Sequence, residues 1–318
     1  MTTHDAIVTE HLSKAYGDKW AVRDLNLNIP TGCVYGFLGR NGAGKSTTIK
    51  MLAGMVRPDQ GRALLLGEDV ATLSPVTRGK IAYMAEGHPL YHWMSIGQMV
   101  RFTRSFYPQW DQKLVDEILD HFELSSKQKC GRLSRGQQAQ VSLALAMAPD
   151  PELLILDDPT LGLDTVVRRE FLEALIQIIQ TRGRTILFSS HVLGDVERVA
   201  SRIGVMVDGV LRVDCPTETF RDAVRKVVVE FADLPPDFPG CPGLVSWRRV
   251  GLQWELVVVE WGPDQQAIVE SYEPRWIDVV EMNLEDAFIE YTRGSRRSVP
   301  SFAREKPHVD SLVVERTA

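Results

Sequence analysis

The sequence is first informative for what it lacks. No apolar run approaches the roughly 20 residues that span a bilayer, and the opening segment MTTHDAIVTEHLSK has no apolar signal core. Only four cysteines occur among 318 residues, far apart and without a CxxC pair, which argues against a disulfide framework or a cysteine metal site. These absences predict a cytoplasmic protein whose cysteines are reduced and structural.

The chain also lacks a basic excess. Lys and Arg number 36 against 42 Asp and Glu, which gives a formal net charge of −6. A nucleic-acid-binding surface must neutralise phosphates with Lys and Arg, so we expect no nucleic-acid partner. With 44% hydrophobic and 25% charged residues, the composition is that of a globular protein with one large domain and an appendage.

Short aliphatic stretches separated by helix-length segments indicate an α/β fold with a parallel sheet. The stretches are residues 33–39 (CVYGFLG), 152–158 (ELLILDD), 185–191 (TILFSSH) and 203–209 (IGVMVDG). Runs rich in Val, Ile and Leu are typical of strands that are buried on both faces. The opening segment IVTEHLSKAYGDKWAVRDLNLNI partly alternates apolar and polar residues, and it predicts antiparallel edge strands beside the parallel core.

Changes of pattern divide the chain further. Within a first domain of residues 1–220, about residues 87–150 carry apolar residues at i, i+3 and i+4 and predict a helical subdomain. Residues 221–294 predict a small α+β domain with a strand, a second strand and a helix, and PPDFPGCPG is the loop between the strands. Residues 295–318 are polar without sustained periodicity, so a flexible tail is expected.

Residues 39–47, GRNGAGKST, fit the phosphate-binding pattern G-x-x-x-x-G-K-[ST] between an apolar strand and a helix-like segment. Glycines let successive backbone N–H groups turn toward the phosphates, and the helix N-terminus adds a positive dipole end. Lys45 is expected to neutralise the β and γ phosphates, and the Ser46 hydroxyl to reach Mg²⁺. The residues predicted to hold ATP here are Gly39, Arg40, Asn41, Gly42, Ala43, Gly44, Lys45, Ser46 and Thr47.

Two adjacent carboxylates close the strand LLIL, in the stretch LLILDDPTLGLD. In phosphate-loop proteins a second strand ends in an acid near Mg²⁺, and Asp157 matches that place. Asp158 is then expected closer to the γ-phosphate, where it can polarise the attacking water. An acid pair alone can equally cap the following turn, and it is the phosphate loop that favours the chemical interpretation.

A third motif, LSRGQ (residues 133–137), precedes the acid pair by about 20 residues. Together and in this order, the three motifs resemble those of the ABC transporter ATPases, a P-loop NTPase family, over about residues 5–215. The stretch FSSHVLGDVERVASRIGVMVDG resembles the family's switch region and puts His191 at the switch histidine. Tyr16 stands where the family carries an aromatic that stacks on adenine.

The resemblance implies a mechanism with two copies of the cassette. The family's cassettes pair head to tail, as homodimers or with a second cassette subunit, so Ser134, Gly136 and Gln137 complete the ATP site of the partner, and Asp164 reaches toward it. ATP and Mg²⁺ are the implied cofactors. Separate polytopic membrane permease subunits are the implied partners, which places the protein at the inner face of the cell membrane.

Three positions depart from the family pattern. Asp158 stands where glutamate is usual; its side chain is shorter by roughly 1.3 Å, and a misplacement of about 1 Å can cost about a hundredfold in rate, so slow hydrolysis is our hypothesis. Glu86 replaces the usual glutamine, and it can ligate Mg²⁺ or hold water, or be a solvated loop acid. Arg135 replaces the usual glycine and is expected to point to solvent rather than to the partner's phosphates.

Six aromatic residues gather at the start of the helical subdomain: Tyr91, Trp93, Phe102, Phe106, Tyr107 and Trp110. Aromatic side chains dominate cores, so we expect most of them in the subdomain core, with one or two lining a groove for the membrane subunit.

Two further stretches, FYPQWDQKLVDEILDHFEL and NLEDAFIEYT, resemble bacterial export-type cassettes. Two functions remain open at this point. One is the ATP-hydrolysing subunit of an exporter, and the other is a slow ATP-dependent dimerisation switch that is not dedicated to transport. The transported substrate is not encoded here, because in this family the membrane subunits select it.

Overall fold

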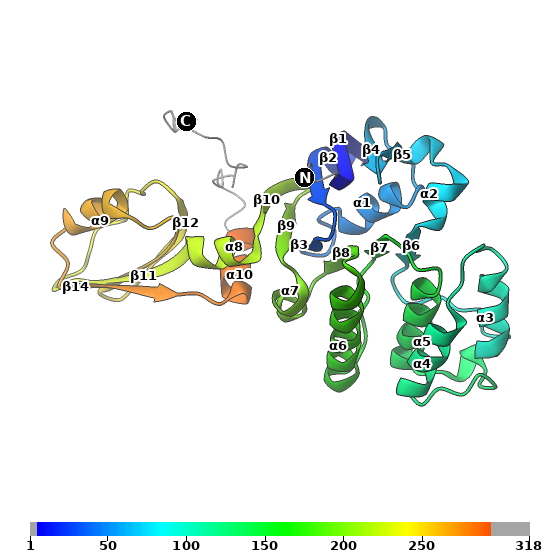
Figure 1. The fold of residues 1–318 in the computed structure, drawn as a ribbon. Helices are drawn as coiled ribbons and strands as arrows, with labels where there is room; N and C mark the ends of the chain where they lie inside the picture. The colour runs from blue at the N-terminus through cyan, green and yellow to red at the C-terminus, as the bar shows by residue number, and fades with distance from the viewer. Residues whose placement is uncertain (1–4, 294–318) are drawn as a thin grey trace.

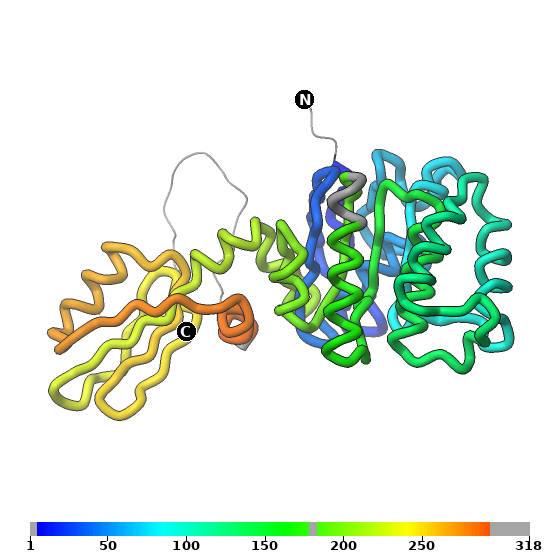
Figure 2. Tube along the Cα trace, turned by 60° about the horizontal axis from the view of Figure 1, so that its bottom comes forward, coloured from blue at the N-terminus to red at the C-terminus, as the bar shows by residue number. Residues whose placement is uncertain are grey.

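The protein is described by a computed structural model over residues 5–293, with the side chains of residues 178–182 and 293 left aside. The tail expected at residues 295–318 lies outside the described residues. Three sheets make up the fold, and the third stands apart from the other two in Figures 1 and 2. None of the helices in the described part is long and apolar enough to cross a membrane.

The central sheet has six strands in the order β10-β9-β3-β8-β7-β6. Their bounds are β3 (Val34–Gly39), β6 (Ile81–Met84), β7 (Leu153–Leu156), β8 (Thr185–Ser190), β9 (Arg202–Val207) and β10 (Val210–Pro216). All neighbours pair in parallel except β10 and β9. The four predicted strands are confirmed, whereas β6 and β10 were not predicted. Because the strands are parallel, the carboxyl ends of β3, β7 and β8 lie at one edge of the sheet.

Helices cover one face of the central sheet, and the opening strands cover the other. The first face packs on α5 (Arg135–Met147), α6 (Thr165–Arg182) and α7 (Leu193–Val199). At Gly36 an added Cβ would come within 2.4 Å of Val196 Cγ1, so glycine is what lets α7 approach β3. The opposite face packs on α1 (Lys45–Leu52) and on the second sheet through Tyr35, Phe37 and Ile49.

The second sheet is antiparallel, with the order β2-β1-β4-β5. Its strands are β1 (Asp5–Tyr16), β2 (Lys19–Pro30), β4 (Gln60–Leu65) and β5 (Glu68–Asp69), followed by η1 (Val70–Thr72) and α2 (Pro75–Gly79). The prediction of antiparallel strands near the N-terminus is confirmed. The strands form a separate sheet, however, because β4 and β5 extend the pair and its inner side chains pack against the central sheet.

The helical subdomain contains α3 (Ile96–Arg104), α4 (Gln112–His121), η2 (Cys130–Arg132) and the start of α5. Its helical character is as predicted. Aliphatic side chains fill its core, with Ile96, Val115 and Val141 fully buried. Figure 1 shows these helices at the end of the molecule opposite to the third sheet.

The third sheet is antiparallel and has the order β12-β13-β11-β14. Its elements are α8 (Thr217–Ala223), β11 (Val224–Glu230), β12 (Leu244–Val250), β13 (Gln253–Val259), α9 (Pro263–Glu270), β14 (Trp276–Glu281) and α10 (Leu284–Arg293). The sequence predicted two strands here, and the structure corrects the number to four. β12 and β14 were missed because β12 is only partly buried, β14 is mostly exposed, and both carry charged residues among the apolar ones.

Candidate nucleotide site

The phosphate-binding loop joins β3 to α1. Gly44 has φ 108° at the N-cap of α1, and an added Cβ there would come within 2.2 Å of the Ala21 carbonyl oxygen, so only glycine fits. The Lys45 amine is buried and donates to the Gly39 carbonyl at 2.6 Å. Burial lowers the pKa of Lys45, and the carboxylates of Asp158, Asp157 and Glu86 oppose that shift. The predicted lysine therefore faces all three predicted acids.

Asp157 lies directly after β7, where two hydroxyls meet its carboxylate. Ser46 Oγ donates to Asp157 Oδ1 at 3.1 Å, and Ser189 Oγ donates to the same oxygen at 3.0 Å. The second oxygen, Oδ2, is buried and has no hydrogen-bond partner among the described residues. The structure thus brings Ser46 and Asp157 together, as the sequence predicted, and leaves one carboxylate oxygen without a partner.

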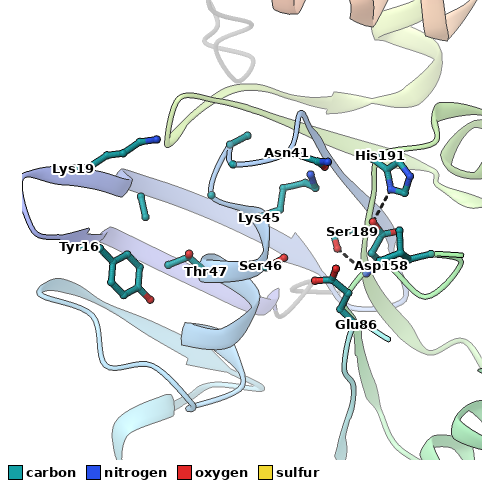
Figure 3. A pocket seen from close by; sticks show the side chains of 15 residues that line it. Tyr16, Lys19, Asn41, Lys45, Ser46, Thr47, Glu86, Asp158, Ser189 and His191 are labelled. Atoms are coloured by element: carbon teal, nitrogen blue, oxygen red, sulfur yellow. Dashed lines mark hydrogen bonds and ion pairs between the residues drawn. The ribbon is translucent and has the colours of Figure 1, made fainter. Parts of the chain in front are cut away.

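Asp158 contacts the predicted switch histidine. Its Oδ2 lies 2.6 Å from His191 Nδ1, and its backbone N–H donates to Ser189 Oγ at 2.9 Å (Figure 3). Asp158 adopts a left-handed φ of 45°, which turns the chain immediately after the strand. Burial raises the pKa of the Asp158 carboxyl, and the hydrogen bond from His191 partly offsets that rise. Asp158 Oδ1 is a further buried oxygen to which the described part of the chain offers no hydrogen-bond partner.

One cavity of about 580 Å³ collects most of these groups, whereas Asp157 lines a second cavity that adjoins it. The predicted residues that line it are Tyr16, Asn41, Gly42, Ala43, Gly44, Lys45, Ser46, Thr47, Glu86, Asp158 and His191. Gly39 and Arg40 instead hold Lys45 through their carbonyls. Tyr16 lies at the outer end of the cavity beside Lys19, and Glu86 lies near Asp158 (Figure 3).

Two polar lining residues were missed by the sequence prediction, together with the apolar Ala21 and Leu161. Ser189 is the last but one residue of β8 and binds both neighbouring aspartates through one hydroxyl, and its signal was the pair of serines before His191. Lys19 opens β2, three residues after Tyr16, and its signal was a lysine in the turn next to the predicted adenine-stacking residue. The fold topology brings both residues to the cavity, because their strands adjoin the strands that carry the motifs.

The residues of the LSRGQ motif, called the signature residues below, lie outside this cavity, as does Asp164. Ser134 caps α5 in a capping box: its hydroxyl accepts from Gln137 N at 3.2 Å, and Gln137 Oε1 accepts from Ser134 N at 3.0 Å. Gly136 packs so closely on α6 that an added Cβ would meet Val167 Cγ1 at 2.7 Å. Asp164 Oδ1 accepts from two N–H groups at the start of α6. None of Ser134, Gly136, Gln137 and Asp164 lines the cavity of its own chain.

Known proteins share this arrangement. The family model described as "ABC transporter" matches residues 22–161. The chain is 33% identical over 303 residues to the uncharacterized ABC transporter ATP-binding protein YcbN of Bacillus subtilis, with 91% of this chain and 97% of that protein covered. It is 32% identical to the bacitracin transport ATP-binding protein BcrA of Bacillus licheniformis, with 69% and 72% covered. The chain belongs to the ABC transporter family.

Solved structures agree with this ABC ATPase fold. An ATP-binding subunit of an ABC transporter superposes with a TM-score of 0.62 at 26% identity, covering 68% of this chain and 92% of that one. A dimeric cassette with ADP and phosphate bound, MJ0796, superposes with a TM-score of 0.60 at 24% identity, covering 66% and 98%. The chain is therefore an ATP-binding and ATP-hydrolysing subunit with a P-loop NTPase fold.

The aromatic cluster of this ABC ATPase differs from the prediction. Tyr91, Trp93, Phe102 and Phe106 are exposed, and Trp93 is 69% accessible. They touch one another in a chain, with ring centroids 5.1 to 6.0 Å apart. The expectation that most of the six are core was wrong, because aliphatic residues of α3, α4 and α5 already fill the subdomain core.

Proposed function

We propose that this ABC ATPase drives export through separate polytopic membrane subunits, as a head-to-tail dimer at the inner face of the cell membrane. The observation that carries the proposal is the division of the motifs. Lys45, Ser46 and Asp158 line one cavity, whereas Ser134 and Asp164 lie outside the cavity of their own chain. A second copy, or a related cassette, would supply the missing signature residues to each ATP.

The residues around Asp157 suit a magnesium ion. Within residues 5–293, Asp157 Oδ2 is buried without a hydrogen-bond partner, and the Ser46 hydroxyl that reaches Oδ1 can turn its oxygen to a cation. Hydroxyl and carboxylate oxygens are the ligands that Mg²⁺ prefers. We propose that Ser46 and Asp157 hold Mg²⁺, with Glu86 at the edge of the site. When bound, the ion supplies charge neutralisation of the β and γ phosphates.

The remaining groups are proposed to bind and orient. The backbone of residues 39–47 cradles the phosphates, Lys45 pairs with them, and Tyr16 stacks on adenine. Asp158 accepts a hydrogen bond from the attacking water, since its Oδ1 has no partner in the described protein. His191 fixes the carboxylate through the 2.6 Å contact to Oδ2, so one oxygen is positioned and the other stays available.

The short side chain of Asp158 predicts slow turnover. Asp158→Glu extends the carboxylate toward the water and is expected to raise the rate, whereas Asp158→Ala removes the group and is expected to lower it by about a hundredfold. Steady-state ATPase assays of the wild type and both variants test this. Equal rates in all three proteins would show that Asp158 takes no part in hydrolysis.

Membrane subunits have a plausible docking surface on this chain. An apolar groove of about 510 Å³ runs between the central sheet and the exposed aromatics, and it is lined by residues that include Leu52, Tyr83 and Phe106. We propose that a helix of the membrane subunit binds there. A relative named for Nod factor export supports export. ATP-dependent uptake of substrate into inverted membrane vesicles tests the direction.

A dimerisation switch is the second candidate. The Asp158 contact with His191 favours it, because an engaged and shortened carboxylate would prolong the closed, ATP-bound dimer. Soluble dimers that retain ATP without a membrane partner would support the switch, and co-purification with a multi-spanning membrane protein would support the transporter. In either case we propose residues 1–220 as the cassette and 221–294 as an accessory domain.

A further inference from the structure

A second cavity, of about 590 Å³, adjoins the nucleotide cavity and shares Glu86 and Leu161 with it. Its walls come from α1, from the loop after β6, from the residues after β7 and from the first turn of α5. The polar side chains that line it include Lys50, Glu86, His88, Arg135, Gln138 and Asp157. The two cavities therefore meet at Glu86, and Asp157 lies on the side of the second cavity.

His88 is the most unusual group in this second cavity. Its side chain is 2% exposed, and neither ring nitrogen makes a hydrogen bond of normal geometry to the described protein, although the Pro159 carbonyl is nearby. An imidazole carries at least one N–H in any protonation state. Buried polar groups without a partner are rare and point to an absent water or ion. His88 is thus a buried donor that faces the cavity.

Two cations complete the lining. Lys50 and Arg135 are exposed at the cavity and form no ion pair within the described part of the chain. Arg135 lies across Gly162, which has φ 75°; a Cβ there would meet Arg135 Nη1 at 2.8 Å. The expected exposure of Arg135 is confirmed, but its side chain packs on Gly162. A guanidinium fixed in this way presents a planar set of donors that suits a phosphate.

We propose that this cavity binds a phosphate-sized divalent oxyanion, with Arg135 and Lys50 as cations and His88 as the buried N–H donor. Glu86 on the shared wall and Asp157 in this cavity repel an anion, so binding would require Mg²⁺ held by these acids. The inference rests on the proposed function, because ATP hydrolysis next door releases such an ion. Free phosphate from the solvent has the same chemistry.

The test is equilibrium binding of radiolabelled inorganic phosphate to the full-length protein with ADP and Mg²⁺. We expect one saturable site per chain that disappears when Mg²⁺ is removed. Arg135→Ala and His88→Leu each weaken binding by about tenfold, as expected for a hydrogen bond to a charged group. Lys50→Gln, an exposed position that preserves folding, weakens it in the same direction.

Two matched variants sharpen the result. Arg132→Ala removes an exposed arginine outside the cavity, and it leaves phosphate affinity unchanged. His88→Asn keeps an N–H donor and retains more affinity than His88→Leu. Equal weakening by Arg132→Ala and Arg135→Ala would mean that phosphate affinity depends only on the overall charge of the protein, which would overturn the site. Absence of Mg²⁺-dependent phosphate binding in an active ATPase would also overturn it.

A second measurement identifies the source of the phosphate. Rapid-quench cleavage is compared with phosphate release, followed by a fluorescent phosphate sensor. If the site holds the product, release lags behind cleavage in the wild type and the lag shortens in Arg135→Ala. If the site binds phosphate without such a lag, it serves free phosphate from solution. A chain that binds phosphate but never hydrolyses ATP would refute the proposed function and leave the site intact.

Discussion

The nucleotide cavity and the C-terminal sheet are assembled in different ways. At the cavity, residues at or after the carboxyl ends of β3, β7 and β8 converge because parallel strands end at one edge, and the Ser189 hydroxyl bonds both the Asp157 carboxylate and the backbone N–H of Asp158. The C-terminal sheet depends on pairing between strands far apart in the chain, and its inner side chains are apolar. Chemistry therefore rests on short fixed motifs, and the sheet rests on distributed packing.

The two regions are nevertheless joined by a common core. Leu284, Ala287 and Phe288 of α10 belong to the same buried cluster as Val196 of α7 and Phe220 of α8. Figure 1 shows α10 beside α8, between the third sheet and the central one. α10 thus packs into the core on the face of the central sheet that α5, α6 and α7 cover, and joins it to the third sheet.

Lys45→Met is expected to have the largest effect. The substitution removes the cation that interacts with Asp158, Asp157 and Glu86, so we expect ATP turnover to fall by at least about a hundredfold, and stability to change little. Lys113→Met, on the exposed face of α4, is the control. Wild-type turnover in Lys45→Met would break the claim that the cavity depends on single residues at fixed positions.

Leu284→Ala tests the common core. The side chain is fully buried, so its loss is expected to lower the free energy of unfolding by about 3 kcal/mol. Urea unfolding followed by circular dichroism measures this, with the exposed neighbour Glu285→Ala as a control expected within about 0.5 kcal/mol. A separate early transition of the third sheet, with the rest unchanged, would show that α10 does not join the two regions.

Much of the fold and site could be predicted from the sequence, for local reasons. The spacing of the motifs alone suggests the roles of residues 39–47 and Asp157. A phosphate loop needs glycines at set positions, and the acid near Mg²⁺ directly follows a strand. The four aliphatic strands were identifiable because they are buried on both faces. β12 and β14 were not, because a strand with one exposed face and charged residues has no such run.

The missed site residues depend on tertiary contacts. His88 and Ser189 have no motif of their own; their environment exists only when β6, β7 and β8 are in register. The aromatics were assigned to the core by residue type. Burial also depends on which other side chains pack in the interior, and here aliphatic residues fill the subdomain core. Residue type alone therefore misplaced Trp93 and its neighbours.

Each region contains a buried thiol, and the reactivities of these two thiols allow a direct comparison of the two regions. Burial raises the pKa of Cys215, on β10, and of Cys241, before β12, to about 11 each. Both thiols are therefore mostly protonated at pH 8, and alkylation should accelerate about tenfold per pH unit until the pH nears that value. Saturating ATP is expected to slow alkylation of Cys215 by roughly tenfold, because ligand binding disfavours opening. Iodoacetamide labelling followed by mass spectrometry measures both sites, and equal protection of Cys241 would contradict a difference between the regions.

The smallest effect is expected for Trp93→Ala. Because the ring is exposed, stability should change by less than about 0.5 kcal/mol and ATP turnover of the isolated protein should stay the same. Trp110→Ala is the matched comparison, since Trp110 packs on the subdomain core and should cost more. Thermal unfolding distinguishes them. An equal loss of stability in the two variants would show that the exposed aromatics contribute to the core after all. Exposed aromatic clusters mark interaction sites. A Trp93→Ala protein with unchanged stability and turnover that fails to co-purify with a membrane subunit would therefore assign this surface to docking.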